Sequence, residues 1–514
     1  MASPQLYPNT LAPAQINKKN LENILHELRV TVSRGTHLVQ EGCPPSVEWD
    51  KAGLYIGVGG IALAFLRLDR QAPSLTEPGQ APLDFGKLAR ERIVSHGPDI
   101  PLRPGRLSPL GSSSPVAAAV MRILAAATSG SAVSDDDITC LQEAVKLALQ
   151  NGHMVTHGDQ IIGCDEFIYG RAGLLWSILN LRLQSFQGDV KKRLQPVFDA
   201  VPDLVDVIIE AGRQGRKDYI KAHGEEEALP LMWSWKKFYL GAVHGITGIL
   251  AVLLACQTEE LNDGVSRNYL PWIADTITGS CKICVANNGH LPTRVPVHSS
   301  SHNSSPLVQI CHGSPGILLL MACARRNPLV TKYWEPVWDE AIRLATERTW
   351  DEGLLSKGGS LCHGIAGNAL SLLLMHDSFE YGQQSMQIAK RNYMDRTQAN
   401  DTRYVEDKVS SDYFLSRALA LLLHAQETPP YSTSNIYRMP DHPFSLHEGL
   451  SGILCAWADA CVGIQARLRK MEMEQEGDGS VSEADLQRDP IFKELASRQL
   501  GFPAIINYRP TGLP

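Results

Sequence analysis

The stretch that decides the fold is ICHGSPG at residues 310–316, which recurs as LCHGIAG at residues 361–367. Each copy places a thiol and an imidazole directly before a Gly-x-x-Gly turn, and an apolar segment of helical length follows the turn. A tight turn into a helix needs the backbone freedom and the close chain approach that glycine allows. Two such pairs of soft donors predict one metal site if the fold brings the two turns together.

The same kind of turn occurs throughout the chain. Including a worn copy in which Ser114 replaces the second glycine, seven turns are found, and their first glycines are Gly57, Gly111, Gly170, Gly245, Gly313, Gly364 and Gly449. Two helices of ordinary length with their connections fit between successive turns. The segments after the turns are apolar on nearly all sides, whereas those between them are amphipathic. This alternation predicts an all-α fold with two concentric rings of helices.

The residue before each first glycine is expected to point into one common mouth. Histidine is frequent at these positions, which include His244, His312 and His363, and in the last turn the position belongs to His447 or Glu448. We also expect the amide donors at the starts of the inner helices to be open at the mouth, where they would favour anions and thiolates.

Composition and charge exclude several classes of protein. The 514 residues carry a formal net charge of −7, which argues against general nucleic-acid binding. No apolar run reaches the roughly 18 residues of a membrane-spanning helix, although peripheral association with a membrane stays open. The first residues show no secretory signal pattern. Eleven scattered cysteines favour reduced thiols and a cytoplasmic location, with the nucleus or the plasma-membrane surface as alternatives.

The chain is expected to form a single domain over residues 1–514. Its core would cover about residues 20–465, joined by a C-terminal part at 490–514. Residues 470–489 between them are polar and acidic, which predicts a disordered insertion.

Three short motifs give the chain a family resemblance. YGRAG at 169–173, LCHGIAGNA at 361–369 and PDHPFSL at 440–446 resemble motifs of the eukaryotic branch of the lanthionine synthetase C-like family. The likeness extends from about residue 20 to about residue 465. It implies an α/α toroid, or barrel, of seven inner and seven outer helices, in agreement with the number of turns.

The resemblance also implies a zinc site. It assigns Cys311, Cys362 and His363 as the ligands of one Zn²⁺ ion. Two thiolates and one imidazole leave the fourth tetrahedral position open, as in catalytic rather than structural zinc sites. The alternative is that these residues only cap buried helices. His312 repeats the place of His363, but we expect it to be a nearby polar or capping residue.

Further site residues follow from the same resemblance. His244 matches a histidine proposed as the acid/base of the lanthionine cyclases in this family. Glu166 matches an aspartate of the same cyclases by its spacing before Gly170. The alternatives are a helix cap for His244 and a solvated acidic pair of Glu166 with Asp165. In eukaryotic members a lysine, an arginine and an aspartate contact glutathione, and here they correspond to Lys357, Arg438 and Asp441. Glutathione carries two carboxylates and one ammonium, which these charges complement.

The leading hypothesis is therefore a zinc-dependent glutathione transferase. It would add the glutathione thiol to dehydroalanine or dehydrobutyrine in proteins or peptides. A non-catalytic zinc- and glutathione-binding regulatory or scaffold protein is the alternative, and an α/α-barrel glycosidase would leave the thiols unexplained. Cys281 and Cys284 are expected to be structural, and Trp233, Trp235 and Tyr239 to pack in the barrel wall.

Overall fold

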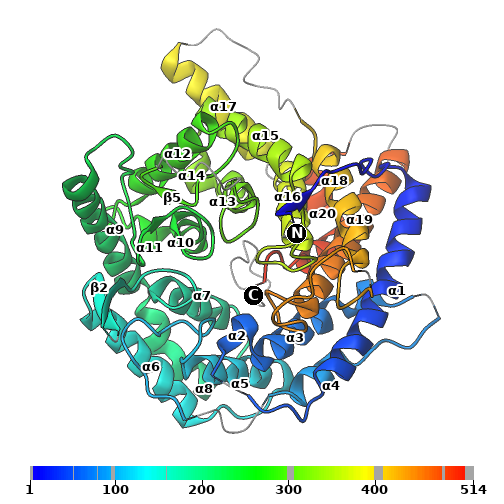
Figure 1. Cartoon of the computed structure of the whole chain (residues 1–514), viewed down its shortest axis with the longest axis horizontal. Helices are drawn as coiled ribbons and strands as arrows, with labels where there is room; N and C mark the ends of the chain where they lie inside the picture. Colours follow the sequence, from blue (N-terminus) through cyan, green and yellow to red (C-terminus); the bar gives the residue numbers. More distant parts are fainter. Residues whose placement is uncertain are drawn as a thin grey trace.

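The computed structural model describes residues 4–49, 51–77, 79–93, 99–157, 159–297, 306–381, 383–398, 409–433, 435–476 and 481–503. Helices form a closed ring in which the N-terminal helix lies beside α19, near the other end of the chain (Figure 1). Within these ranges, no helix combines the length and the apolarity that crossing a membrane requires.

The inner layer consists of the helices that follow the seven turns. They are α3 (Val58–Leu75), α5 (Val116–Ser129), α7 (Arg171–Arg182), α10 (Ile246–Leu253), α13 (Ser314–Arg326), α16 (Ile365–Tyr381) and α19 (Leu450–Glu476). Each packs on the next, and α19 packs on α3 to close the ring. Their surfaces are buried on nearly all sides, as their apolar sequences predict.

The outer layer alternates with the inner one along the chain. Its helices are α1 (Lys18–Gly42), α4 (Phe85–Arg90), α6 (Asp135–Gln150), α9 (Val201–His223), α12 (Leu270–Ala286), α15 (Pro336–Asp351) and α18 (Ser411–His424). An outer helix such as α6 buries one stripe, which includes Leu141, Ala144 and Ala148, and exposes much of its opposite face. The predicted α/α toroid is confirmed, with a short outer element, α4, in the worn second repeat.

Shorter elements connect the two layers. The helices are α2 (Gly53–Ile56), α8 (Gly188–Asp199), α11 (Thr258–Leu261), α14 (Pro328–Thr331), α17 (Gln383–Thr397), α20 (Glu483–Arg488), α21 (Pro490–Ser497) and the 3-10 helix η2 (Ala425–Glu427). The strands pair antiparallel as β1 (Leu6–Tyr7) with β6 (Leu354–Leu355), β2 (Met154–His157) with β3 (Gln160–Gly163), and β4 (Phe238–Tyr239) with β5 (Arg294–Val295).

The second glycine of several turns is required by close backbone packing. A Cβ atom on Gly367 would lie 1.8 Å from the carbonyl oxygen of Leu361, and one on Gly452 would lie 1.8 Å from that of Leu446. In both turns the carbonyl belongs to the sixth residue before the glycine. Any side chain there would displace the loop that precedes the inner helix.

Backbone hydrogen bonds join neighbouring turns into a belt around the mouth. The amide of Cys311 donates to the carbonyl of Cys362 at 3.2 Å, and the amide of Cys362 donates to that of His447 at 2.8 Å. His447 donates in turn to Tyr55 at 3.1 Å, and Tyr55 to Leu110 at 2.9 Å. Turns that are distant in sequence are therefore held in register at the mouth.

The amides at the starts of several inner helices are not open, and this expectation is wrong for α7, α10, α16 and α19. The amide of Ile365 donates to the carbonyl of Gly358 at 2.9 Å, and the amide of Leu450 to that of Pro443 at 2.8 Å. Equivalent bonds join α7 and α10 to carbonyls seven residues upstream. Each preceding loop folds back and satisfies the donors itself.

The predicted disorder at 470–489 is wrong for the described part of that segment. Helix α19 continues to Glu476, and α20 and α21 follow. Ion pairs hold this segment: Arg469 donates to Asp489 at 2.8 Å, and Lys470 pairs with Glu380 of α16. Residues 477–480 and 504–514 lie outside the described residues.

After α21, the chain enters the interior of the ring. Arg67 Nη2 donates to the carbonyl of Gly501 at 2.6 Å, and the amide of Leu500 donates to Asp459 Oδ1 at 3.1 Å. Phe502 is fully buried, and its ring centre lies 5.6 Å from that of His447. This segment therefore packs against the inner helices α3 and α19, which carry Arg67 and Asp459, and against the turn that contains His447.

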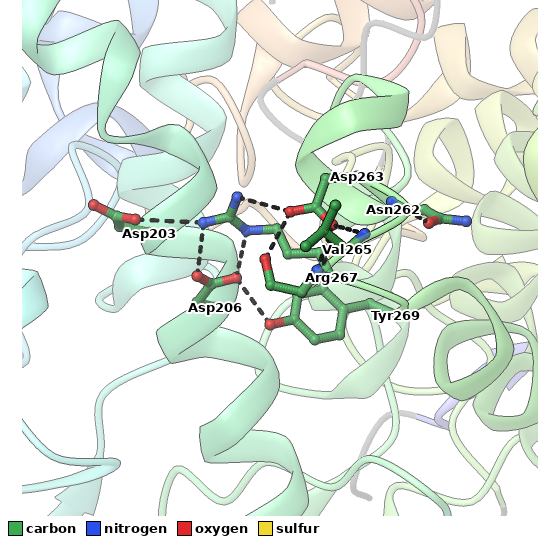
Figure 2. A network of polar contacts seen from close by, with 9 residues as sticks. Asp203, Asp206, Asn262, Asp263, Val265, Arg267 and Tyr269 are labelled. Atoms are coloured by element: carbon green, nitrogen blue, oxygen red, sulfur yellow. Dashed lines mark hydrogen bonds and ion pairs between the residues drawn. The ribbon is translucent and has the colours of Figure 1, made fainter.

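A polar network ties the outer helix α9 to the loop after α11, as Figure 2 shows. Arg267 donates to Asp206 from Nε at 2.8 Å and from Nη2 at 2.9 Å, and Tyr269 donates to the same carboxylate at 2.9 Å. Asp263 accepts the amides of Arg267 and Val265, and these bonds hold the pKa of its carboxyl well below the ordinary value. The network orders the outer layer and contains no site residue predicted from the sequence.

Candidate metal centre

Two thiols and one imidazole meet at the mouth. The ligand atoms of Cys311, Cys362 and His363 all lie within 4.8 Å of one another, and this is the only such group of three in the described part of the chain. Zinc–sulfur and zinc–nitrogen bonds of about 2.0–2.3 Å place tetrahedral ligands within about 4 Å of each other, so small side-chain movements would complete the site. Both thiols are buried, whereas His363 is half-buried.

The pKa values of the two thiols are shifted in opposite directions. The pKa of Cys311 is lowered because the Cys362 thiol donates a hydrogen bond to it, and the charge of Lys357 also favours its thiolate. The pKa of Cys362 is raised well above the ordinary value, because its thiol is engaged in that bond and is buried. The pair thus shares one proton in a position that a soft divalent cation would fill.

Gln309 is a neighbour of the donor group that the sequence did not indicate. Its side-chain amide donates to Cys311 Sγ at 3.1 Å, and the residue is buried. This bond orients the sulfur and favours its thiolate. The second copy of the repeated motif has Ser360 at the equivalent position. Comparison of the two copies therefore could not indicate a role for Gln309.

His244 and Glu166 form a pair in the mouth. His244 Nδ1 lies 3.2 Å from Glu166 Oε2. Burial lowers the pKa of His244, but the hydrogen bond and the negative charge of Glu166 outweigh it, so the pKa is raised. Glu166 also accepts the amides of Ile168 and Tyr169, at 3.0 and 2.8 Å, which fixes its carboxylate.

Asp165 does not share this role. Its carboxylate accepts two hydrogen bonds from the guanidinium of Arg171, at 2.6 and 3.0 Å, and both residues are buried. The two acids are therefore not a solvated pair: Asp165 anchors α7, and Glu166 contacts His244.

Aromatic rings surround His244. Trp235 stacks on its imidazole with ring centres 4.8 Å apart and planes inclined by 12°, and Tyr239 lies at 6.3 Å. Trp233 packs in the wall as predicted, with its indole donating to the carbonyl of Ile208 at 2.8 Å. Trp235 and Tyr239 are also predicted to pack in the wall, and the structure adds that both of their rings flank His244.

The other cysteine and histidine candidates lie outside the donor group. The ring centre of His312 is 6.0 Å from that of His244, and burial lowers the pKa of His312 to about 4, aided by the charges of His244 and Lys357. Cys281 and Cys284 are buried in α12, where the thiol of Cys284 donates to the carbonyl of Gly289 at 3.3 Å. These contacts agree with structural roles for the two cysteines.

The three residues that the family resemblance assigns to glutathione binding, Lys357, Arg438 and Asp441, lie on two adjacent loops. The amide of Arg438 donates to the carbonyl of Ser356 at 2.9 Å, which places Arg438 beside Lys357. Arg438 Nη2 lies 2.5 Å from Asp441 Oδ1, and both side chains are exposed. The charge of Lys357 also acts on Cys311, so this charged cluster borders the donor group.

The toroid of helices, its repeated turns and the Cys₂His group at its mouth together match a known family model. The model described as lanthionine synthetase C-like protein matches residues 48–473, so the chain belongs to the lanthionine synthetase C-like family.

Two eukaryotic relatives and one solved structure are similar to this chain. "Glutathione S-transferase LANCL1" of Danio rerio is 27% identical over 312 residues, which are 60% of this chain and 62% of the relative. "LanC-like protein GCL1" of Arabidopsis thaliana is 27% identical over 314 residues, 60% of this chain and 58% of the relative. Less than two thirds of either relative is therefore matched. The solved structure of nisin cyclase matches 96% of this chain and 98% of its own, at 14% identity and a TM-score of 0.38, a value too low to transfer structural detail.

Proposed function

We propose that this chain is a zinc-dependent glutathione transferase that adds the glutathione thiol to dehydroalanine or dehydrobutyrine residues of proteins or peptides. The observation that carries the proposal is the group formed by Cys311, Cys362 and His363, which leaves one position of a tetrahedral ion for an incoming thiol. The name of the Danio rerio relative supports glutathione as that thiol.

The proposed reaction is a conjugate addition. Zinc held by the three ligands would lower the pKa of the glutathione thiol and supply thiolate character near neutral pH. The sulfur forms a bond to the β-carbon, the carbon–carbon double bond becomes single, and the α-carbon gains a proton in place of the one lost by the thiol. His244 is the proton donor, and Glu166 holds its Nδ1 so that Nε2 serves proton transfer.

The charged cluster beside the donor group is proposed to orient glutathione. Lys357 and Arg438 supply two cations for its two carboxylates, and Asp441 supplies one carboxylate for its ammonium. The ion pair between Arg438 and Asp441 is exposed, so it contributes little to stability and exchanges readily for contacts with a ligand.

Removal of one zinc ligand tests the proposal. Cys362→Ala should lower the zinc content from about one ion per chain to nearly none, and it should abolish the glutathione adduct on a dehydroalanine peptide. Elemental analysis and mass spectrometry measure the two effects. Cys281→Ala removes another buried thiol and should change neither. Adduct formation by Cys362→Ala at the wild-type rate would contradict a zinc-dependent mechanism.

The scaffold alternative predicts a different result for the wild-type chain. A non-catalytic protein would bind zinc and glutathione, form no adduct with any dehydroamino-acid peptide, and be insensitive to His244→Ala. A transferase would keep its zinc in His244→Ala while losing most of its turnover. Comparing ligand binding with adduct formation in these two proteins therefore separates the hypotheses.

A further inference from the structure

A cavity of about 190 Å³ lies where the first two repeats meet. Its walls include the loop before α3 and the first turns of α5 and α6, with Lys51, Gly53, Ser114, Ala117 and Ala118 among the lining residues. It contains none of the proposed zinc ligands and none of the proposed glutathione contacts. It is therefore a separate feature of the worn second repeat.

Helix α5 reaches this cavity with its first amides unsatisfied. It has no side-chain cap, and no residue within the described ranges accepts a hydrogen bond from the amides of Val116, Ala117 or Ala118. These three residues are only 0, 5 and 6% exposed. In α7 and α16, by contrast, loop carbonyls accept the corresponding bonds. Buried donors without an acceptor are costly, so such a helix end usually holds a ligand or ordered water.

Ser114 points to a ligand independently of the helix. It is 3% exposed, lines the cavity, and its hydroxyl has no hydrogen-bond partner. In the other turns this position belongs to the second glycine, which has no polar group to satisfy. The substitution therefore adds one buried donor beside the three amides.

Lys51 supplies positive charge to the same cavity. Its side chain forms no ion pair with any residue in the described part of the chain, and its carbonyl accepts the amide of Ser113 at 2.7 Å, which fixes its backbone beside α5. Asp137 also lines the cavity, but Arg122 Nε lies 2.9 and 3.0 Å from its two oxygens and neutralises it. The remaining acid, Asp136, offsets Lys51, so the uncapped positive end of α5 decides which charge is bound.

We propose that this cavity binds a small phosphate-type anion through the Ser114 hydroxyl, the first amides of α5 and the ammonium of Lys51. Its volume equals that of roughly six water molecules at about 30 Å³ each, which accommodates inorganic phosphate or the phosphate end of a small metabolite. A peptide segment would not fit. Gly53 lines the cavity, and Tyr55, two residues further on, lies beside Cys362, so α2 separates this site from the metal centre.

Calorimetric titration of the zinc-loaded full chain with inorganic phosphate, at constant ionic strength, tests the proposal. We expect one phosphate per chain, and Ser114→Ala and Lys51→Gln should each weaken its binding by about tenfold or more. Lys146→Gln removes an exposed lysine of α6 outside the cavity, and Lys357→Gln removes the cation beside the metal centre. Both control variants should bind phosphate as the wild type does.

Three results would overturn the proposal. Phosphate that does not bind at all would mean that ordered water satisfies the α5 amides. Binding that is lost in Lys357→Gln but kept in Ser114→Ala would place phosphate at the charged cluster instead. Binding of Ca²⁺ in preference to phosphate would make the two aspartates the ligands. A parallel titration with glycerol phosphate distinguishes the sources, because equal affinity indicates the phosphate end of a metabolite and weaker affinity indicates free phosphate.

Discussion

His244 depends on one neighbour for its proton affinity. Glu166→Gln keeps the size of the side chain but removes the charge that raises the pKa of His244 against burial, so that pKa should fall. A proton donor is active below its pKa. The limb of kcat/KM that decreases with rising pH should therefore move to lower pH. Glu352→Gln alters a second Glu–His contact, 3.3 Å from His290, and should leave the profile unchanged. An unmoved profile in Glu166→Gln would exclude His244 as the donor.

Site residues that occupy equivalent positions of the sequence repeat could be predicted from the sequence. Site residues that contact the others only through the folding of the chain could not. Cys311, Cys362 and His363 stand at equivalent places of a visible repeat, so their convergence followed from the ring. Gln309 reaches Cys311 from a place where the other copy has a serine. Trp235 stacks on His244 from nine residues upstream, a contact that depends on how the chain between them folds.

The second glycine of a turn controls the position of a whole element. Gly367→Ala would place a Cβ atom 1.8 Å from the carbonyl oxygen of Leu361 and displace the loop that carries Cys362. The free energy of unfolding should fall by about 3 kcal/mol or more, together with zinc affinity, as measured by urea denaturation and competition with a chelator. Gly463→Ala in α19 meets its nearest atom, Leu373 Cδ1, at 3.5 Å and should be neutral or slightly stabilising. Equal losses in both variants would contradict the role of close packing.

The order of the elements followed from hydrophobic periodicity, but their ends did not. Apolar and amphipathic segments separated the inner helices from the outer ones. The sequence did not show that the first amides of α16 are bound by its own preceding loop, because that depends on how the loop folds back. It also missed the helices at 470–489, where an acidic composition suggested disorder although Arg469 and Lys470 pair with acids.

The C-terminal segment connects the interior of the molecule with its mouth. Phe502→Ala should lower the free energy of unfolding by about 3–5 kcal/mol, because a fully buried ring is lost. It should also speed zinc loss, since His447, which contacts this ring, accepts the amide of Cys362 at 2.8 Å. Urea denaturation and a chelator-based rate measure the two effects. Ile491→Ala, which changes a residue that is 52% exposed on α21, is the control and should alter neither.

The belt of hydrogen bonds gives the metal centre a consequence for the folding of the whole molecule. In a repeat protein each unit contacts mainly its neighbours, so parts of the chain can unfold separately. Cys311 and Cys362 belong to successive repeats that are already joined by an amide–carbonyl bond of 3.2 Å. Zinc at this place would act as a cross-link across the seam between these repeats. Metal binding would thus convert a ring of partly independent repeats into one cooperative folding unit.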